Sequence, residues 1–563
     1  MSDTTTDSDA IKIKQNKKMI DPGDYCALIC RAPNRLRLVN AHSEVVEVIE
    51  KSLIEYKLDF KLYFSSQVTC AFKLISKPFV PGGCSEEKTI KIKRALARMI
   101  VQLQTINWEI VINTDIGREN TNSCIFFRKI VILNRFKKEK FERDGNIFIF
   151  SPSGDHNILL IDVPSNIEKE VVENITNVCK VENYDLIENV DDAFITSKLS
   201  LKGYSWYATE EHAVAIRKMV LKVIKVARSH KYELVTNLNV KGTTDSLLFQ
   251  HKRSLSSRLP IPRALLDYPE DMFIMSLNRN DRLRLIEAPR YIETKTKEVI
   301  SQNWGVQDVG EYAGSFEVKM YGRPWWADGE DTVRARNLIA VLIAKFKSLG
   351  WEVGASVDMS RKLQDKTVFM FRQCPAKDQK FAVLSFHETD KIRFLSSSSN
   401  TVMLTDEINK ILEAANVIQN ICFYEKAKQW QIKGVPFSGD ANHGADQRLM
   451  VHHLTKILKH FHNLGWKLVA SADISAKYYK NNSKEYPLDT HSWFFLHDPE
   501  SIVMSDTIVI SHTNNDESLN IDDVDQFCVS EIRSEKSNCR IILRVYLPLA
   551  IILILIISFV FFM

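Results

Sequence analysis

A carboxylate or its amide recurs in this chain at a fixed distance from four aromatic residues. The aromatic anchors are Trp108, Tyr232, Trp351 and Trp466, and the residues seven positions later are Asp115, Asn239, Asp358 and Asp473. Serines at positions 356, 360, 471 and 475 accompany the third and fourth copies. A carboxylate beside hydroxyl groups can act as a general base or as a ligand for a hard cation. Asp358 and Asp473 are therefore the candidate catalytic residues.

The same residues can serve the backbone instead. Asp and Ser at the end of a strand can accept hydrogen bonds from backbone N–H groups of the turn that follows. Asn239, in the second copy, can accept such a bond but cannot act as a base. This replacement favours a structural role. An enzymatic site at Asp358 and Asp473 stays open as the alternative.

Each anchor follows an amphipathic helix and begins a strand. Apolar residues recur three and four positions apart before the anchor, as on the buried stripe of a helix. In the fourth copy these residues are Leu454, Ile457, Leu458, Phe461 and Leu464. The other copies carry apolar residues at matching places, and an aromatic strand such as 368–371 comes later in each.

These elements belong to a unit that occurs four times. Each unit is predicted to run hairpin, helix, strand, helix, strand, strand, with a period of about 110 to 125 residues, longer than the repeat of a solenoid. We predict an α+β protein of four tandem domains, each an antiparallel sheet with two helices on one face. Alternating Arg and Leu over 35–38 and 282–285 predicts hairpin strands with one face in solvent.

Shifts in composition place the boundaries of the domains. The predicted segments are a disordered N-terminus over 1–22, repeat domains over 23–134, 145–253, 270–374 and 379–512, an acidic flexible stalk over 513–540 and a transmembrane tail anchor over 541–563. The stalk is predicted from its low apolar content and its acidic run at 522–525.

Two segments carry a resemblance to a known repeat. Residues 321–326 (YGRPWW) and 349–360 (LGWEVGASVDMS) resemble repeats of uncharacterised fungal and other eukaryotic proteins. The similarity would cover about 25–512, which implies a repeated module and carries over no catalytic residue. The second unit departs most from the pattern, with Asn239 in place of the aspartate and Ser205 in place of a proline.

A corner with an aromatic residue precedes each long helix. The four corners are Pro78-Phe79, Ser205-Trp206, Pro324-Trp325 and Pro436-Phe437. The aromatic residue of each corner is expected to fill the gap between helix and sheet. The residue after it, Trp326 or Tyr207, is the better candidate for a ligand or partner surface, because aromatic faces suit cations and prolines.

Neither composition nor motifs indicate a cofactor. The 563 residues carry a net charge of +5, which gives no electrostatic case for nucleic acid as a partner. The ten cysteines contain no CxxC pair, as is typical of a reducing compartment. Histidines crowd the region 443–462, but no cysteine or carboxylate of matching spacing accompanies them. We expect no cofactor and no metal site.

An uncharged apolar run extends from Val545 to Met563. As a helix, about 19 residues cover roughly 28 Å, enough for the hydrocarbon core of a bilayer. Apolar positions spaced along this predicted transmembrane helix are Val545, Leu547, Ile551, Leu555 and Phe559. The segment 536–544, before the run, carries three basic residues, which predicts that the repeats face the cytosol.

This topology resembles that of tail-anchored membrane proteins. The N-terminal residues contain no apolar run that could act as a signal peptide. The short span suits the thin bilayer of the endoplasmic reticulum, which is the expected location. Cys539, beside the span, is a candidate for palmitoylation.

Three hypotheses about function follow. The first is a non-enzymatic adaptor that presents repeated domains to a cytosolic protein partner, because several copies on one chain favour multivalent binding. The second is an enzyme with sites at Asp358 and Asp473. The third is a binder of anionic lipid headgroups that uses the arginines of the hairpins. These arginines are Arg35, Arg37, Arg282 and Arg284.

Overall fold

The structure is a computed structural model that describes residues 24–66, 68–118, 121–130, 147–190, 194–240, 244–251, 271–362, 364–397, 401–438, 444–475, 477–481 and 484–499. The chain divides into two units, Met1–Val509 and Ile510–Met563, and every described residue belongs to the first. The predicted N-terminal segment 1–22, the stalk, Cys539 and the tail anchor 541–563 lie outside the described residues. Within the described part, no helix has the length and apolar character needed to cross a membrane.

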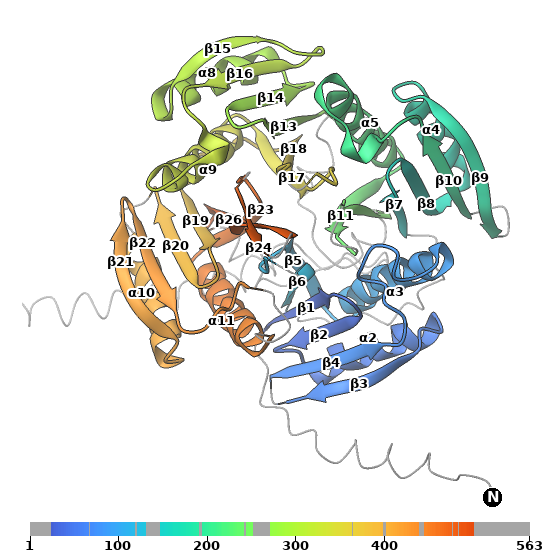
Figure 1. Ribbon diagram of the computed structural model, residues 1–563, viewed down its shortest axis with the longest axis horizontal. Coiled ribbons are helices and arrows are strands. Elements are labelled where there is room, and N and C mark those ends of the chain that lie inside the picture. Colours follow the sequence, from blue (N-terminus) through green and yellow to red (C-terminus); the bar gives the residue numbers. More distant parts are fainter. Residues whose placement is uncertain are drawn as a thin grey trace, which may run out of the picture. The chain divides into compact units, whose positions relative to one another are not determined.

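The described residues of the first repeat form a six-stranded sheet with two helices (Figure 1). The elements are β1 (Tyr25–Arg31), β2 (Arg35–Val39), α2 (Ser43–Glu55), β3 (Phe60–Ser65), β4 (Thr69–Leu74), α3 (Glu86–Thr105), β5 (Trp108–Thr114) and β6 (Thr121–Lys129). The strand order is β3-β4-β2-β1-β6-β5, and every neighbouring pair is antiparallel.

The second and third repeats have the same topology. The second contains β7 (Ile147–Ser153), β8 (Asn157–Pro164), α4 (Ser165–Thr176), β9 (Val181–Val190), β10 (Phe194–Leu201), η1 (Ser205–Tyr207), α5 (Glu210–Ser229), β11 (Tyr232–Leu238) and β12 (Ser246–His251). The third contains β13 (Met272–Asn278), β14 (Arg282–Ile286), α8 (Arg290–Asn303), β15 (Val306–Glu311), β16 (Phe316–Met320), η2 (Pro324–Trp326), α9 (Asp331–Ser348), β17 (Trp351–Val357) and β18 (Val368–Gln373).

The fourth repeat adds a small hairpin to this plan. Its elements are β19 (Phe381–His387), β20 (Lys391–Ser396), α10 (Thr401–Ala414), β21 (Ile418–Tyr424), β22 (Ala427–Ile432), α11 (Gly444–Asn463), β23 (Trp466–Ala472), β24 (Tyr478–Asn481), β25 (Lys484–Pro487) and β26 (Asp489–His497). Strands β24 and β25 pair with each other in the connection between β23 and β26. The α+β architecture of four repeats predicted from the sequence is confirmed.

One strand of each repeat is absent from the sequence prediction. Strands β3, β9, β15 and β21 lie at an edge of their sheets, each paired with one neighbour. Polar residues occur on both faces of β9, β15 and β21; β15, for example, reads VQDVGE and is half-buried or exposed along its whole length. Because an exposed edge strand does not need an apolar face, it lacks the alternation by which strands are recognised.

The long helices end as their sequences predict. The residue before each anchor takes the left-handed conformation that commonly terminates a helix. These residues are Asn107 (φ 67°), Lys231 (φ 65°), Gly350 (φ 85°) and Gly465 (φ 78°). The reversal lets the anchor start a strand that packs back on its own helix, as α3 does on β5 and α9 does on β17.

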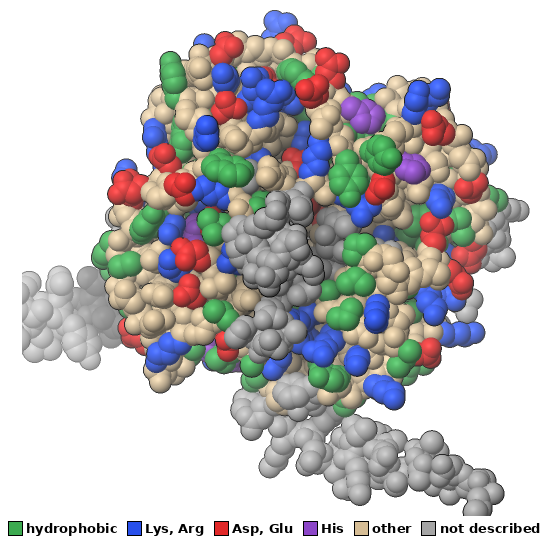
Figure 2. All heavy atoms as spheres, viewed as in Figure 1, with side chains coloured by type: hydrophobic (Ala, Val, Ile, Leu, Met, Phe, Trp, Pro, Cys, Tyr) green, Lys and Arg blue, Asp and Glu red, His purple; other side chains and the backbone are tan. Residues whose placement is uncertain are grey.

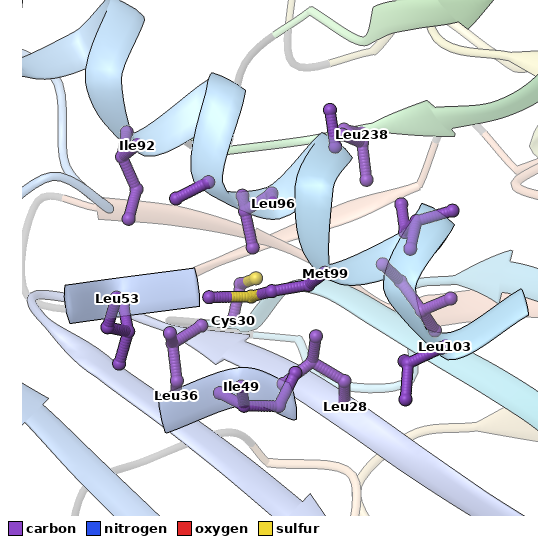
Figure 3. Packing of buried hydrophobic residues seen from close by; sticks show 14 of the residues in the cluster. Leu28, Cys30, Leu36, Ile49, Leu53, Ile92, Leu96, Met99, Leu103 and Leu238 are labelled. Atoms are coloured by element: carbon purple, nitrogen blue, oxygen red, sulfur yellow. The ribbon is translucent and has the colours of Figure 1, made fainter. Parts of the chain in front are cut away.

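Each sheet is buried on both faces. Leu28 and Cys30 of β1 pack with α2 and α3, and Figure 3 shows Met99 of α3 extending toward them. The alternate residues Ala27 and Ile29 belong to the core that contains α11 of the fourth repeat. The prediction that the hairpins have one wet face is therefore wrong. A helix from another repeat covers that face, and it leaves Arg37 only 3% exposed.

The same packing occurs between successive repeats and closes on itself. Helix α3 of the first repeat shares a core with the second sheet, α5 with the third sheet and α9 with the fourth. Helix α11 then packs against β1 and β2 of the first repeat. The four repeats thus form a closed cycle of contacts, in which no repeat can bury its sheet without its neighbour.

Candidate functional site

The recurrent carboxylates cap the turns that leave the anchor strands. Asp115 Oδ1 accepts a hydrogen bond from the N–H of Gly117 at 3.0 Å. Asp358 Oδ1 accepts from Ser360 N–H at 3.0 Å, and Asp473 Oδ1 from Ser475 N–H at 2.9 Å. These are the bonds that the structural interpretation of the sequence predicts.

The two serines continue the turn. Ser360 Oγ accepts from the N–H of Lys362 at 3.1 Å, and Ser475 Oγ accepts from the N–H of Lys477 at 3.2 Å. Ser360 and Ser475 thus use their hydroxyl oxygens to accept backbone hydrogen bonds, as in a chain of short polar turns.

A second set of residues joins these turns to the neighbouring repeat. Each member opens the last strand of its repeat, and its side chain accepts a hydrogen bond from the backbone N–H of the turn residue in the next repeat. The pairs are Ser123 with Asn239 (2.9 Å), Asp245 with Asp358 (2.7 Å), Thr367 with Asp473 (2.9 Å) and His491 with Asp115 (3.3 Å). The last pair connects the fourth repeat to the first and completes the cycle.

Sequence reasoning missed these junction residues. They are Ser, Asp, Thr and His, so no residue type repeats, and what they share is a hydrogen-bond acceptor. The one signal available was their register, because each stands at the start of the aromatic strand.

The four repeats also meet through their anchor strands. Strands β5, β11, β17 and β23 surround a cavity of about 150 Å³, to which each repeat contributes lining residues. Main-chain and apolar groups such as Ile110, Leu234 and Leu468 make up much of its wall.

Burial makes the central carboxylates weak acids. It raises the pKa of Asp115 to about 8, and the charges of Asp473 and Asp245 add to this effect. Burial likewise raises the pKa of Asp473 to about 7 and that of Asp245 to about 6. The pKa of Asp358 lies well above its ordinary value, through burial and then through the charge of Asp245. A pKa near neutrality suits a general base, but a network of buried carboxylates produces the same shift.

Access to substrate bears on both explanations. A general base must come within hydrogen-bond distance of its substrate, directly or through one water. Neither Asp358 nor Asp473 lines the cavities of about 150, 260 and 330 Å³ that lie elsewhere between repeats. No group of three or more His, Cys, Asp or Glu among the described residues is arranged to hold a metal ion. The hydrogen bonds of Asp358 and Asp473 to the turns support a structural role, and an enzymatic site at these residues stays a hypothesis.

In the second and third repeats, the first aromatic residue of the corner is buried and the second is more exposed. Trp206 and Trp325 are 1% and 0% exposed, and their indole N–H groups donate to the carbonyls of Asn157 at 2.8 Å and Arg282 at 2.9 Å. Tyr207 is 40% exposed, with the guanidinium of Arg361 5.5 Å from the centre of its ring. Trp326 is half-buried.

Two of the four hairpin arginines proposed for lipid headgroups are buried between repeats. Arg37 and Arg284 are 3% and 4% exposed. Both Arg282 and Arg284 bond to the carboxylate of Glu317, Arg284 at 2.6 Å. Arg35 and Arg282 are half-buried, so the four arginines differ in how far solvent reaches them.

The fold and its junctions define a class of protein: a closed four-repeat α+β scaffold. One model of a domain family matches the chain four times, over residues 24–128, 146–253, 271–372 and 380–496. The chain belongs to this family, and the matches coincide with the four sheets. A search of curated proteins found no match.

Proposed function

We propose that the protein is a membrane-attached binding scaffold. In this proposal the apolar segment 545–563 inserts into an internal membrane, the endoplasmic reticulum, as a tail anchor. The four repeats face the cytosol and bind a protein partner. The repeated polar residues stabilise the junctions between repeats, and the partner binds at the edge strands of the sheets.

The observation that carries the proposal is the free edge strand of each repeat. Among the described residues, strands β3, β9, β15 and β21 each pair on one side, and the N–H and C=O groups of the other side can accept an extended peptide. Three of these strands also expose large apolar side chains, among them Tyr63 (52%), Leu186 (55%) and Phe423 (78%). Alternate side chains of an edge strand can give such pairing its specificity.

Surface charge supports a protein partner over a polyanion. Basic and acidic side chains are interspersed over the described part of the face seen in Figure 2. Together with the small net charge of +5, this mixture provides no broad field of one sign for a nucleic acid.

The membrane part of the proposal is tested by topology. The full chain receives an N-terminal tag, and a second variant lacks residues 541–563. We expect the full chain to sit on endoplasmic reticulum membranes with a tag that protease digests in intact vesicles, and the shortened chain to leave the membrane. A protected tag would reverse the topology and overturn the cytosolic scaffold.

The partner surface is tested by site-specific cross-linking in cells. A photo-reactive residue replaces Phe423 on β21 or, as a control of similar exposure, Val402 on α10 (66%). We expect a discrete cross-linked partner from position 423 and not from 402. Equal yields from both positions would remove the edge strand as the docking surface.

Turnover of any substrate that disappears in folded Asp358→Ala or Asp473→Ala variants would favour the enzyme instead.

A further inference from the structure

A cavity of about 330 Å³ lies between the second and third repeats. Its walls are the first half of α5, the turn between β13 and β14, and the segment that leads from β17 to β18. This segment is fixed to the second repeat, because Arg361 N–H donates to the carbonyl of Trp206 at 2.8 Å and Lys362 Nζ donates to that of Ala208 at 2.6 Å. The cavity is therefore part of a built junction, and its volume falls within the range of small-molecule sites.

Positive charge dominates the wall of this cavity. The cations that line it are Arg217, Arg279, Arg284, Lys362 and Lys366, and the carboxylates are those of Glu210 and Asp365. Glu317, outside the cavity, balances Arg284 at 2.6 Å. The charge of Asp365 acts on Arg217, Lys362 and Lys366 together; Asp358 also acts on Arg217, and Asp473 on Lys366, from outside the cavity.

Two of these cations are buried with hydrogen-bonding capacity to spare. Arg217 is 4% exposed; its Nη1 donates to Asn278 Oδ1 at 3.1 Å and its Nη2 lies 3.5 Å from Asp365, while its Nε has no partner among the described residues. Lys366 is also 4% exposed, and its Nζ bonds to the carbonyl of Gln364 at 3.0 Å. A buried charge that is incompletely paired lowers stability unless a counter-charge joins it.

The pKa values reflect this excess of charge. Burial lowers the pKa of Arg217; Asp365 opposes the change, and the neighbouring charge of Arg284 adds to it. Burial lowers the pKa of Lys366 in the same way, with Arg217 as the neighbouring cation. A bound anion would reverse both effects.

The junction between the third and fourth repeats has a similar arrangement, in which Asp489 lies close to the arginine. Arg336 precedes its anchor by the same distance as Arg217, and Asp489 precedes its junction residue by the same distance as Asp365. Asp489 is 5% exposed and lies 3.0 Å from Arg336 Nη2 and 3.1 Å from His387 Nδ1. At that junction a carboxylate of the chain fills the position between Arg336 and His387. At the junction of the second and third repeats, the space remains open.

The start of α5 adds a further preference for anions. Thr209, Glu210 and Ala213 line the cavity, so the first turn of this helix of 20 residues faces it. The free N–H groups and the dipole at a helix N-terminus attract negative charge. The carboxylate of Glu210 at the rim opposes this attraction and is outnumbered by the cations.

We propose that this cavity binds a small molecule through a phosphate group, which would lie between Arg217, Arg279 and Lys366. Guanidinium groups pair with the oxygens of phosphate in a planar, bidentate geometry, and the lysine adds a compact charge. The site is independent of the edge strands proposed to bind a protein partner, so either can fail without the other.

The test is calorimetric titration of the full chain in detergent with inositol trisphosphate, a soluble phosphate ester. Vesicles that contain phosphatidylinositol bisphosphate form a second arm, which distinguishes a lipid headgroup from a free ligand. Arg279→Asn is the critical variant: Arg279 is exposed at the rim, and its φ of 51° is one that Asn readily adopts, so folding should be retained. Arg323→Asn, an exposed arginine of the same repeat outside the cavity, is the matched control.

We expect Arg279→Asn to weaken binding about tenfold, the loss of one charge-assisted contact, and Arg323→Asn to bind as the unaltered chain does. Arg217→Gln and Lys366→Gln should weaken it further, and a melting curve of each variant reports whether it folds. Binding by the soluble ester alone would identify a free ligand, and binding by the vesicles alone a headgroup; both agree with the site. Equal loss in Arg279→Asn and Arg323→Asn, or no binding of either probe, would overturn the proposal.

Discussion

Replacing Asp473 with Asn separates the structural explanation of the central carboxylates from a chemical one. Asp473 is half-buried, and its Oδ1 accepts the N–H of Ser475 at 2.9 Å. An asparagine can accept the same bond through its own Oδ1, and the second repeat carries Asn239 at the equivalent position. If the carboxylate does no more than accept this bond, its negative charge destabilises the folded protein at neutral pH. Removal of the charge should then stabilise the protein.

The size of the effect follows from the pKa. Burial raises the pKa of Asp473 from 3.8 to about 7 in the folded protein. At about 1.4 kcal/mol for each tenfold change in proton affinity, ionisation of this carboxyl costs the folded state roughly 4 kcal/mol. The new amide N–H₂ group must be buried, which costs about 1–3 kcal/mol if it finds no partner. We therefore expect Asp473→Asn to gain about 1–3 kcal/mol above pH 7.

The sign depends on pH. The folded protein holds this proton more tightly than the unfolded chain does, so stability falls as pH rises from 3.8 to about 7 and stays low above that range. Below this window both states are protonated and the gain from Asn should vanish. Asp473→Asn should therefore flatten the pH dependence of stability. Asp115→Asn should do the same, because the pKa of the Asp115 carboxyl is raised to about 8 in the folded protein.

The measurement is urea unfolding of the fragment Met1–Val509, followed by tryptophan fluorescence at about pH 5 and about pH 8.5. Asp473→Ala is the control, because it removes the charge together with the acceptor for Ser475. It should show the same flattening but lie about 1 kcal/mol below Asp473→Asn at every pH. A loss of stability in Asp473→Asn that is as large at high pH as at low pH would refute the reasoning, since it would mean that the ionised carboxylate has a partner.

Two further substitutions probe packing and the junctions. Trp325→Ala should cost about 3–5 kcal/mol in the same unfolding assay, because it empties a site that is 0% exposed, whereas Trp326→Ala, at a half-buried residue, should cost about 1–2 kcal/mol. Equal costs would contradict the division of the corner into a buried and a surface residue. Arg336→Met should cost about 3–5 kcal/mol because it leaves Asp489 buried without its cation, and adding Asp489→Asn should recover most of the loss. No recovery in the double variant would show that the charge pair is not what stabilises this junction.

The sequence predicts those features that depend on residues near one another in the chain. The stripe from Leu454 to Leu464 identifies α11 because each apolar residue packs against the same core. The turn-capping role of Asp358 and Asp473 is predictable because the bond spans two residues. The aromatic corners are predictable for the same reason.

Features that depend on the neighbouring repeat could not be predicted. The alternation at Arg35–Val39 matches a strand with a wet face, yet α11, far along the chain, covers that face. Ser123 and His491 each accept a backbone N–H of the next repeat, at different junctions and with unrelated side chains, so no repeated residue type marks the position. Periodicity reports how buried a face is expected to be within one unit, and it contains no information about a helix supplied by the next.

The closed cycle makes the differences between junctions informative. Four repeats that share one geometry could use one pair of residues at every junction, yet the chain uses Lys93 with Ser151, Arg217 with Asn278, Arg336 with Asp489 and Arg31 with Gln447. To close the cycle, each junction between repeats needs only side chains that fill its space and balance its buried charges. The third junction meets both conditions with Asp489. The second meets neither within the described residues, because its cavity is open and its cations outnumber its carboxylates. A junction with excess positive charge is less stable than one whose charges are balanced within the chain, and binding of an anion would restore that stability.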